Sequence, residues 1–258
     1  MTSASQLGDR TSWPALQIEP VVEAARAALR PPGRVRWIID GRPDRIELRT
    51  VVRRWSTAAE PSARLARLTC GTALRAVRLS VVVQSRQPLV SYADKPGLLA
   101  VVYPGGVAAP RRDDLLLYAM LRRGTNRAPH PAGLPDRAAV ARRLRRAAES
   151  EGAWLRLLPE SPAPSAALGP CWCDVDDRRE VELSREAMVA VIGAPGRSPA
   201  ADLRAGQALE TVRLTAMALG LEMYVLAAPA APTTSAVSRC VGRTSDTLAV
   251  VRIDRPER

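Results

Sequence analysis

The chain has 258 residues, of which 47% are hydrophobic and 25% are charged, a balance that excludes a disordered or fibrous protein. The length fits one large domain or two smaller ones. The formal net charge of +12 suggests nucleic-acid binding, yet all 38 basic residues except Lys95 are arginine, which suggests a GC-rich coding sequence. No recognised DNA- or RNA-binding motif and no interleaved aromatic residues accompany the charge. Nucleic acid is therefore not the partner we expect, although arginine suits a groove for an anionic ligand.

The cysteines and the apolar segments predict a cytoplasmic protein without a structural metal. Cys171 and Cys173 are separated by one residue rather than by the two that are usual in a zinc site, and His130 is the single histidine. No run of 18 apolar residues occurs, and Asp9 and Arg10 lie where the apolar part of a signal peptide would begin. We expect no membrane segment, no bound metal and reduced thiols.

The first part of the chain predicts one series of elements after a polar, irregular tail over residues 1–18. An Ala-rich amphipathic pattern stops at Pro31-Pro32-Gly33, as a helix does. The turn Asp40-Gly41 separates two alternating stretches and indicates a β-hairpin. The expected elements are helices over 19–29 and 61–83, hairpin strands over 35–39 and 45–48, and a buried strand over 98–103.

A second series follows. The expected helices cover 113–123, 135–150 and 199–219, and the expected strands cover 154–158, 188–192, 223–226 and 247–253. Gly152 and Gly220 lie where two of these helices stop, and the Pro-, Ala- and Ser-rich residues 161–170 indicate a loop. The run Arg142-Arg143-Leu144-Arg145-Arg146 predicts a solvated helix face, with docking of an anionic partner as the alternative.

A repeated sequence pattern, which we call the internal echo, links the two series. Residues 68–80 and 203–215 are identical at seven of 13 positions, with an offset of 135 residues, about half the chain. Two Ala-, Leu- and Arg-rich helices could converge on such a match by chance, but duplication explains it better. Two equivalent long helices, each with a glycine at the same position (Gly71 and Gly206), could pack closely against each other as in a homodimer. We therefore predict a tail and two related halves, over residues 1–18, 19–110 and 111–258.

Residues 206–221 resemble the interface helix of nitroreductase-like proteins, which has the form G-x-A-x-x-x-x-L-x-x-x-A-x-x-L-G-L. Residues 189–196 and 202–208 are similar to the Acg branch of that family, in which two nitroreductase-like halves are fused in one chain. The stretch 149–158 also looks like the family's A-A-x-x-E-G-A-x-L segment, so the resemblance covers most of residues 19–253. It implies an α+β fold with a mixed sheet flanked by helices, arranged as an internally duplicated pseudo-dimer.

A candidate phosphate site follows from the same resemblance. Residues 122–129 are similar to the family's R-R-x-T-N-R-x-P segment, a version of the R-R-S-x-R motif that holds the FMN phosphate in nitroreductases. Arginine guanidinium groups and a hydroxyl are suitable hydrogen-bond donors to a dianionic phosphate. The alternative is that residues 122–129 are simply the solvated end of a helix. The resemblance implies that the FMN-binding residues here are Arg122, Arg123, Thr125, Asn126 and Arg127.

Two further segments correspond to parts of the family's flavin site. In the family, the segment P-S-x-x-N-x-Q-P-W has polar side chains at or near the flavin. In this chain only its tryptophan is present, as Trp37, and the alternative role of Trp37 is that of a buried aromatic residue in a strand. Val225, Leu226 and Ala227 occupy the stretch where nitroreductases offer backbone groups to the isoalloxazine ring, with an ordinary strand as the alternative. The chain is also shorter between Pro159 and Arg179 than family members with a lid-like insertion.

The resemblance implies an FMN-dependent oxidoreductase that passes electrons from NADH or NADPH to a small-molecule nitro, quinone or ene-type acceptor. Such a protein needs no catalytic acid or base of its own, and no catalytic residue is identified. The lost polar positions and the short lid favour an alternative, a degenerate non-catalytic member that stores flavin or acts as a scaffold or partner subunit. Further homodimerisation of the pseudo-dimer stays open.

Overall fold

The computed structural model describes residues 15–28, 37–42, 44–50, 61–95, 97–123, 136–158, 187–196, 198–227 and 247–255. Its first series of elements is α1 (Ala15–Ala27), β1 (Trp37–Arg42), β2 (Arg45–Thr50), α2 (Pro61–Val83), β3 (Arg86–Lys95), β4 (Leu98–Val107) and α3 (Arg112–Arg123). Its second series is α4 (Arg137–Glu149), β5 (Trp154–Leu157), β6 (Met188–Ala194), α6 (Pro199–Ala218), β7 (Glu222–Ala227) and β8 (Thr247–Asp254).

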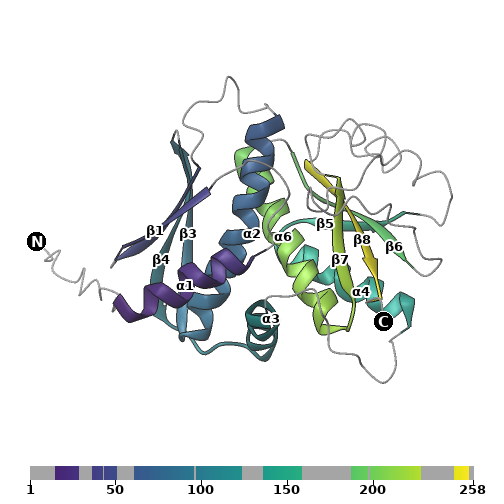
Figure 1. The fold of residues 1–258 in the computed structure, drawn as a ribbon, viewed down its shortest axis with the longest axis horizontal. Coiled ribbons are helices and arrows are strands. Elements are labelled where there is room, and N and C mark those ends of the chain that lie inside the picture. The colour runs from purple at the N-terminus through teal and green to yellow at the C-terminus, as the bar shows by residue number, and fades with distance from the viewer. Residues whose placement is uncertain are drawn as a thin grey trace, which may run out of the picture.

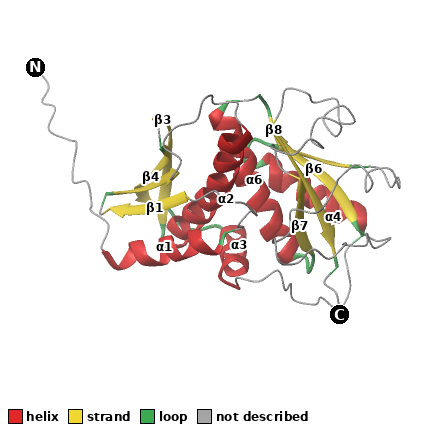
Figure 2. Ribbon diagram, turned by 45° about the horizontal axis from the view of Figure 1, so that its top comes forward, coloured by secondary structure: helices red, strands yellow, loops and turns green. Residues whose placement is uncertain are grey.

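The described residues form an α+β fold with five helices and two four-stranded antiparallel sheets. Helices α2 and α6 lie side by side in the middle of the molecule, with one sheet on either side of the pair (Figure 1). Figure 2 shows the same arrangement from a second direction, with the two groups of strands separated by helices. None of the helices in this part of the chain is long and apolar enough to cross a membrane.

Every helix and strand expected from the sequence is present, with ends that differ by a few residues. Strand β3 was not expected, because Pro88 interrupts its short alternating pattern. The expectation of a mixed sheet was wrong for the described strands, since all their pairings are antiparallel. Each half keeps its four strands in a sheet of its own, because the paired helices stand between the two sheets.

The two sheets have the same strand order. The order is β1-β2-β4-β3 in the first sheet and β5-β6-β8-β7 in the second, so the strands correspond one to one. The helices correspond as well, because α1 and α4 precede the first two strands of their half and α2 and α6 follow them. This repeated helix–strand–strand–helix–strand–strand order is consistent with the duplication that the sequence echo indicates.

Helices α2 and α6 approach most closely at a pair of glycines. A Cβ atom added at Gly71 would lie 2.3 Å from the carbonyl oxygen of Leu203 and 2.8 Å from the Cα atom of Gly206. A Cβ atom added at Gly206 would lie 2.0 Å from the carbonyl oxygen of Leu68. The contacts are reciprocal, as they are in an isologous interface between two identical subunits. The matching glycines of the echo therefore lie at the point where the helices cross.

Each half has its own hydrophobic core beside this crossing. The first sheet packs Ile46, Leu48 and Val102 against Leu74 of α2, and α1 closes the cluster. In the second half, α4 and α6 cover the sheet, and Leu209 belongs to a cluster built from β5, β6, β7 and β8. Because both cores include a face of α2 or α6, the helix pair joins them into one structure.

We predict that Gly206→Ala destabilises the protein strongly, because the new methyl group would meet backbone atoms of α2 that cannot rotate away. Overpacking of this kind costs on the order of 3 kcal/mol of the free energy of unfolding, measured by chemical denaturation. Gly106→Ala is the matched control, since nothing lies within 4 Å of a Cβ atom at Gly106. Equal stability of the two variants would contradict the tight helix crossing.

Candidate functional site

The first candidate residues lie at the end of α3. Arg122 and Arg123 form the last turn of this helix and are exposed, and a nitrogen of Arg122 lies 3.5 Å from a carboxylate oxygen of Glu23 in α1. Both partners of this ion pair have side chains more than half exposed, at 54% and 58%, so it contributes little to stability. The other predicted phosphate ligands, Thr125, Asn126 and Arg127, lie outside the described residues.

Trp37 begins β1 at the edge of the first sheet. It is partly buried and packs against the core cluster of the first half, beside residues such as Ile46 and Leu48. This packing gives Trp37 a structural role as a strand aromatic. A contact with flavin stays an untested prediction for this residue.

Strand β7 lies at one edge of the second sheet and ends with Val225, Leu226 and Ala227. The side chains of Val225 and Leu226 are buried, while the pairing of β7 with β8 shifts register between Val225 and Ala227. A bulge in an edge strand leaves backbone groups outside the regular ladder. The buried side chains of this segment serve the core, and a backbone contact with flavin stays a prediction.

The described candidates come from three separate elements. Strands β1 and β7 lie on opposite sides of the α2–α6 pair, and α3 lies at one end of that pair (Figure 1). The structure therefore brings Trp37 and the 225–227 segment to different sheets rather than to one cluster. Besides the glycine crossing and the shared hydrophobic clusters, polar contacts around α2 and α6 connect the two halves.

The most extensive polar contact between the halves is centred on Glu151, in the turn that follows α4. Its two carboxylate oxygens lie 3.1 Å from Nε of Arg75 and 2.5 Å from a terminal nitrogen of Arg78. The Thr211 hydroxyl lies within 3.3 Å of the same carboxylate and 2.9 Å from Nε of Arg75. The Glu151 side chain is only 4% exposed, so this network lies in the interior. We name these four residues the Glu151 network.

The Glu151 network continues toward the surface through Gln207 of α6. Arg78 donates to the side-chain oxygen of Gln207 at 2.7 Å, and the Gln207 amide donates to the Tyr92 hydroxyl of β3 at 3.1 Å. Burial lowers the pKa of the Arg75 guanidinium, while the Glu151 carboxylate opposes that shift. The network thus neutralises the buried charge of Arg75 with a residue from the other half of the chain.

A second pair of opposite charges joins the halves near the start of α6. Asp202 is completely buried, with one carboxylate oxygen 2.7 Å from a terminal nitrogen of Arg67. Its other carboxylate oxygen lies 3.4 Å from Nε of Arg64. Arg67 and Asp202 occupy equivalent positions of the internal echo, so the duplicated positions now carry opposite charges. None of the residues in either buried cluster was predicted from the sequence, because their partners lie far apart along the chain.

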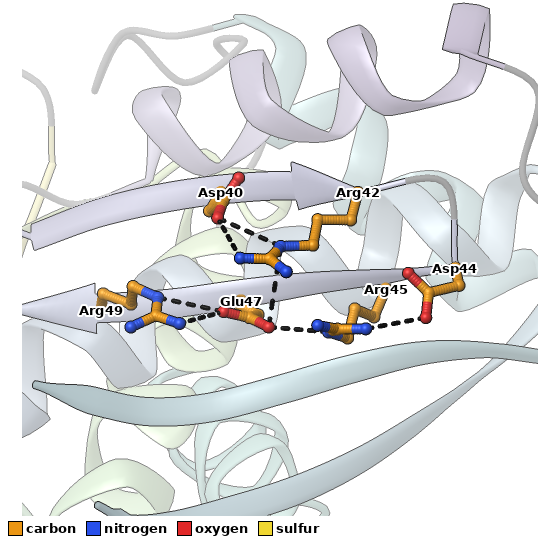
Figure 3. Close-up of polar contacts among 6 residues, drawn as sticks. All are labelled: Asp40, Arg42, Asp44, Arg45, Glu47 and Arg49. Carbon is orange, nitrogen blue, oxygen red and sulfur yellow. Dashed lines mark hydrogen bonds and ion pairs between the residues drawn. The ribbon is translucent and has the colours of Figure 1, made fainter. Parts of the chain in front are cut away.

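A third polar cluster lies on the face of the first sheet that points away from α1 and α2 (Figure 3). Glu47 of β2 stands between Arg45 and Arg49, with oxygen-to-nitrogen distances of 2.7 and 2.5 Å, and Arg42 of β1 lies 3.9 Å away. Hydrogen bonds from Arg45 and the neighbouring positive charges lower the pKa of the Glu47 carboxyl below its ordinary range. This cluster holds the β1–β2 hairpin together on its solvent side.

Thiol and metal chemistry find no support in the described residues. Burial of the Cys70 side chain raises the pKa of its thiol far above the ordinary range, so it is not a nucleophile in the folded protein. No group of three or more His, Cys, Asp and Glu residues that could hold a metal ion occurs in the part of the chain described here. The remaining cysteines and His130 lie outside it.

Comparison with known proteins adds no assignment. No protein-family model matches the chain, and no curated protein is similar to it.

We predict that Glu151→Gln lowers the free energy of unfolding by about 3 kcal/mol, because it removes the nearer counter-ion of the buried Arg75 and leaves only the longer 3.8 Å pair with Asp114. Chemical denaturation of the purified variant measures the loss. Glu149→Gln removes the same charge from an exposed position two residues earlier and should change stability by less than about 0.5 kcal/mol. A loss shared equally by both variants would show that net charge, rather than the buried pair, is responsible.

The pKa of Glu47 generates a second expectation. A carboxyl whose folded-state pKa is lowered stabilises the fold above its ordinary pKa of 4.5, and this contribution disappears as the pH falls through the lower folded-state value. Wild type should therefore be more stable than Glu47→Gln at pH 6, and the difference should shrink steadily toward about pH 3. Denaturant midpoints across that range provide the measurement. A difference that stays constant with pH would rule out the ionised carboxylate as its source.

Proposed function

We propose that the chain is an FMN-binding oxidoreductase of the nitroreductase-like type, in which one chain forms the pseudo-dimer that two subunits form elsewhere in the family. The observation that carries this proposal is the repeated strand order of the two sheets, joined along α2 and α6 at Gly71 and Gly206. In the proteins that the sequence resembles, such a helix pair is the subunit interface. The flavin ring would then lie in the crevice between the two halves.

The charges at the end of α3 suit a phosphate group. Carbonyl groups make the C-terminal end of a helix electrically negative, so an anion binds there only where cationic side chains compensate. Arg122 and Arg123 supply two such side chains, both on the solvent side of the helix. The Arg122–Glu23 pair is exposed and weak, so a dianionic phosphate would replace Glu23 at little cost.

The end of β7 suits the flavin ring. An aromatic ring with carbonyl and imino groups at its edge is bound well by backbone amides in fixed positions. The edge position of β7 and the register shift between Val225 and Ala227 provide that kind of backbone, while the buried side chains of Val225 and Leu226 keep the strand in place. In this arrangement the chain positions the ring and shields it from water.

When bound, FMN supplies the redox chemistry, taking up hydride from NADH or NADPH and passing electrons to a nitro, quinone or ene-type acceptor. The chain's contribution is then binding and orientation. Arg122, Arg123 and, after them in sequence, Arg127 would neutralise the phosphate charge, and Thr125 and Asn126 would donate hydrogen bonds to its oxygens. The buried ion pairs that α2 makes with α6 and with the turn after α4 hold the two halves at a fixed separation, which a site built between them requires.

The second candidate function is that of a non-catalytic family member that stores flavin, acts as a scaffold or serves as a partner subunit. Two observations favour it. Trp37, the only residue retained from the family's polar flavin segment, packs into the core of the first half. Arg122 already has a carboxylate partner in Glu23. If the chain is such a non-catalytic member, it keeps the α2–α6 pair for stability and has lost the redox chemistry.

The test begins with the visible absorbance spectrum of the purified protein, before and after FMN is added. Bands near about 370 and 450 nm that bleach when NADPH is added anaerobically would support the oxidoreductase. Bound flavin that NADPH and NADH fail to reduce would support the storage role. No binding of added FMN would overturn both flavin roles and leave the scaffold or partner subunit.

The phosphate site is tested by the double variant Arg122→Gln/Arg123→Gln. Loss of two charge-assisted contacts should weaken FMN binding by roughly 100-fold or more, measured by quenching of flavin fluorescence. Arg111→Gln/Arg112→Gln removes two exposed charges at the opposite end of α3 and should leave the affinity within about two-fold. Equal weakening by the two double variants would mean that overall charge, rather than a phosphate site, attracts FMN.

A further inference from the structure

Helix α4 presents a strongly basic face to solvent. Its inner side consists of Val140, Ala141, Leu144 and Ala148, which are buried where the helix packs on α6 and β5. The exposed side carries Arg142, Arg143, Arg145 and Arg146. We name these four residues the α4 arginine face.

The α4 arginine face differs from the other arginine clusters because its charges are not compensated. Arg75 and the arginines around Glu47 have carboxylates within ion-pair distance, whereas none of the four α4 arginines forms an ion pair with another described residue. The acidic residues at the two ends of the helix are Asp136 and Glu149. Like charges three or four residues apart cost a helix roughly 0.2–0.5 kcal/mol per pair. An anion bound across the exposed side of α4 would offset this repulsion between the arginines.

The positive surface extends beyond α4. Gly152 follows the helix in a left-handed conformation, with a φ angle of +68°. A Cβ atom added at Gly152 would lie 3.9 Å from Cδ of Arg204, an exposed arginine of α6. A further exposed arginine, which forms no ion pair with any described residue, therefore lies next to the turn that follows α4.

We propose that the α4 arginine face binds the phosphate backbone of double-stranded DNA without reading its sequence. Duplex DNA carries about one negative charge per 1.7 Å, so a helix of 13 residues, about 20 Å long, faces on the order of 12 phosphate charges. Guanidinium groups bind phosphate oxygens in pairs and need no other side chain to do so. This binding is independent of the flavin site.

The side chains on the exposed side of α4 favour DNA over other anions. The outer side carries arginines, Glu149 and small alanines, with no amide or hydroxyl to read base edges and no aromatic to stack on RNA bases. It has no exposed aromatic or large apolar anchor of the kind that forms the centre of a protein–protein interface. The apolar residues of α4 are already buried in the core, so the helix cannot insert them into a membrane surface. The absence of a base-reading motif in the sequence is compatible with this proposal, because backbone binding requires only charge.

The test measures binding of a fluorescein-labelled DNA duplex of about 20 base pairs to the full chain by fluorescence anisotropy. If four phosphates are neutralised, the affinity should fall by about 100-fold between roughly 50 and 200 mM salt, with a logarithmic slope of about −3.6. Arg142→Gln/Arg146→Gln should reduce that slope by about half. The matched control is Arg111→Gln/Arg112→Gln, which removes the same charge from exposed positions at the start of α3 and should leave the slope unchanged.

Three outcomes would overturn the proposal. The first is no binding of the wild-type chain to the duplex at about 50 mM salt, and the second is equal weakening by the α4 and α3 double variants. The third is tight, α4-dependent binding to phosphatidylserine vesicles or polyglutamate with weaker binding to DNA, which would assign the face to a membrane or an acidic protein. Replacing α4 arginines relieves repulsion within the helix, so a thermal melt at or above that of wild type confirms that the variant is folded.

Discussion

The contact between Gly71 and Gly206 sets the separation of α2 and α6, and the positions of both sheets follow from it. Any side chain larger than hydrogen at either position would meet the backbone of the opposite helix at 2.8 Å or less. Each sheet packs against the outer side of this helix pair through its own hydrophobic core. The close crossing therefore joins two four-stranded sheets into one structure.

The same close approach explains why so many charged residues are buried between the halves. Helices that touch at glycine bring the residues on either side of the crossing within hydrogen-bond distance, so Asp202 of α6 reaches Arg67 of α2, and Glu151 in the turn after α4 reaches Arg75 of α2. Replacing such a pair with apolar residues is often neutral, so the pairs contribute little net stability. Their effect is on register, since sliding α2 along α6 would separate Arg67 from Asp202, and moving α2 away from the turn after α4 would separate Arg75 from Glu151. The echo positions Arg67 and Asp202 show how a duplicated interface diverged, because equal residues there would repel each other.

How far the sequence predicts this structure depends on the range of the interactions involved. The long helices and most strands follow from local periodicity, and the matching glycines at 71 and 206 indicate the helix pair because the echo makes two distant segments comparable. Strand β3 was missed because Pro88 breaks its local pattern, although its pairing with β4 tolerates the proline. The partnership of Glu151 with Arg75 could not be predicted, since nothing local marks one glutamate among many as the buried one. Of the candidate flavin residues, Arg122 and Arg123 are exposed at the end of α3, and Trp37 is partly buried against the core of the first half; their contact with flavin stays a prediction.

Arginine occurs in this chain both in buried ion pairs and on exposed surfaces. Because nearly every basic residue is arginine, the composition alone does not distinguish the two uses. Buried arginines such as Arg75 require a carboxylate, because a guanidinium removed from water without one would destabilise the fold. The α4 arginines are exposed to water and have no such requirement. The net charge of +12 is thus the excess left after the interior has been neutralised. Since the buried arginines are paired with carboxylates and the four exposed arginines of α4 are not paired with any described residue, we expect the excess charge to act at the surface rather than in the fold.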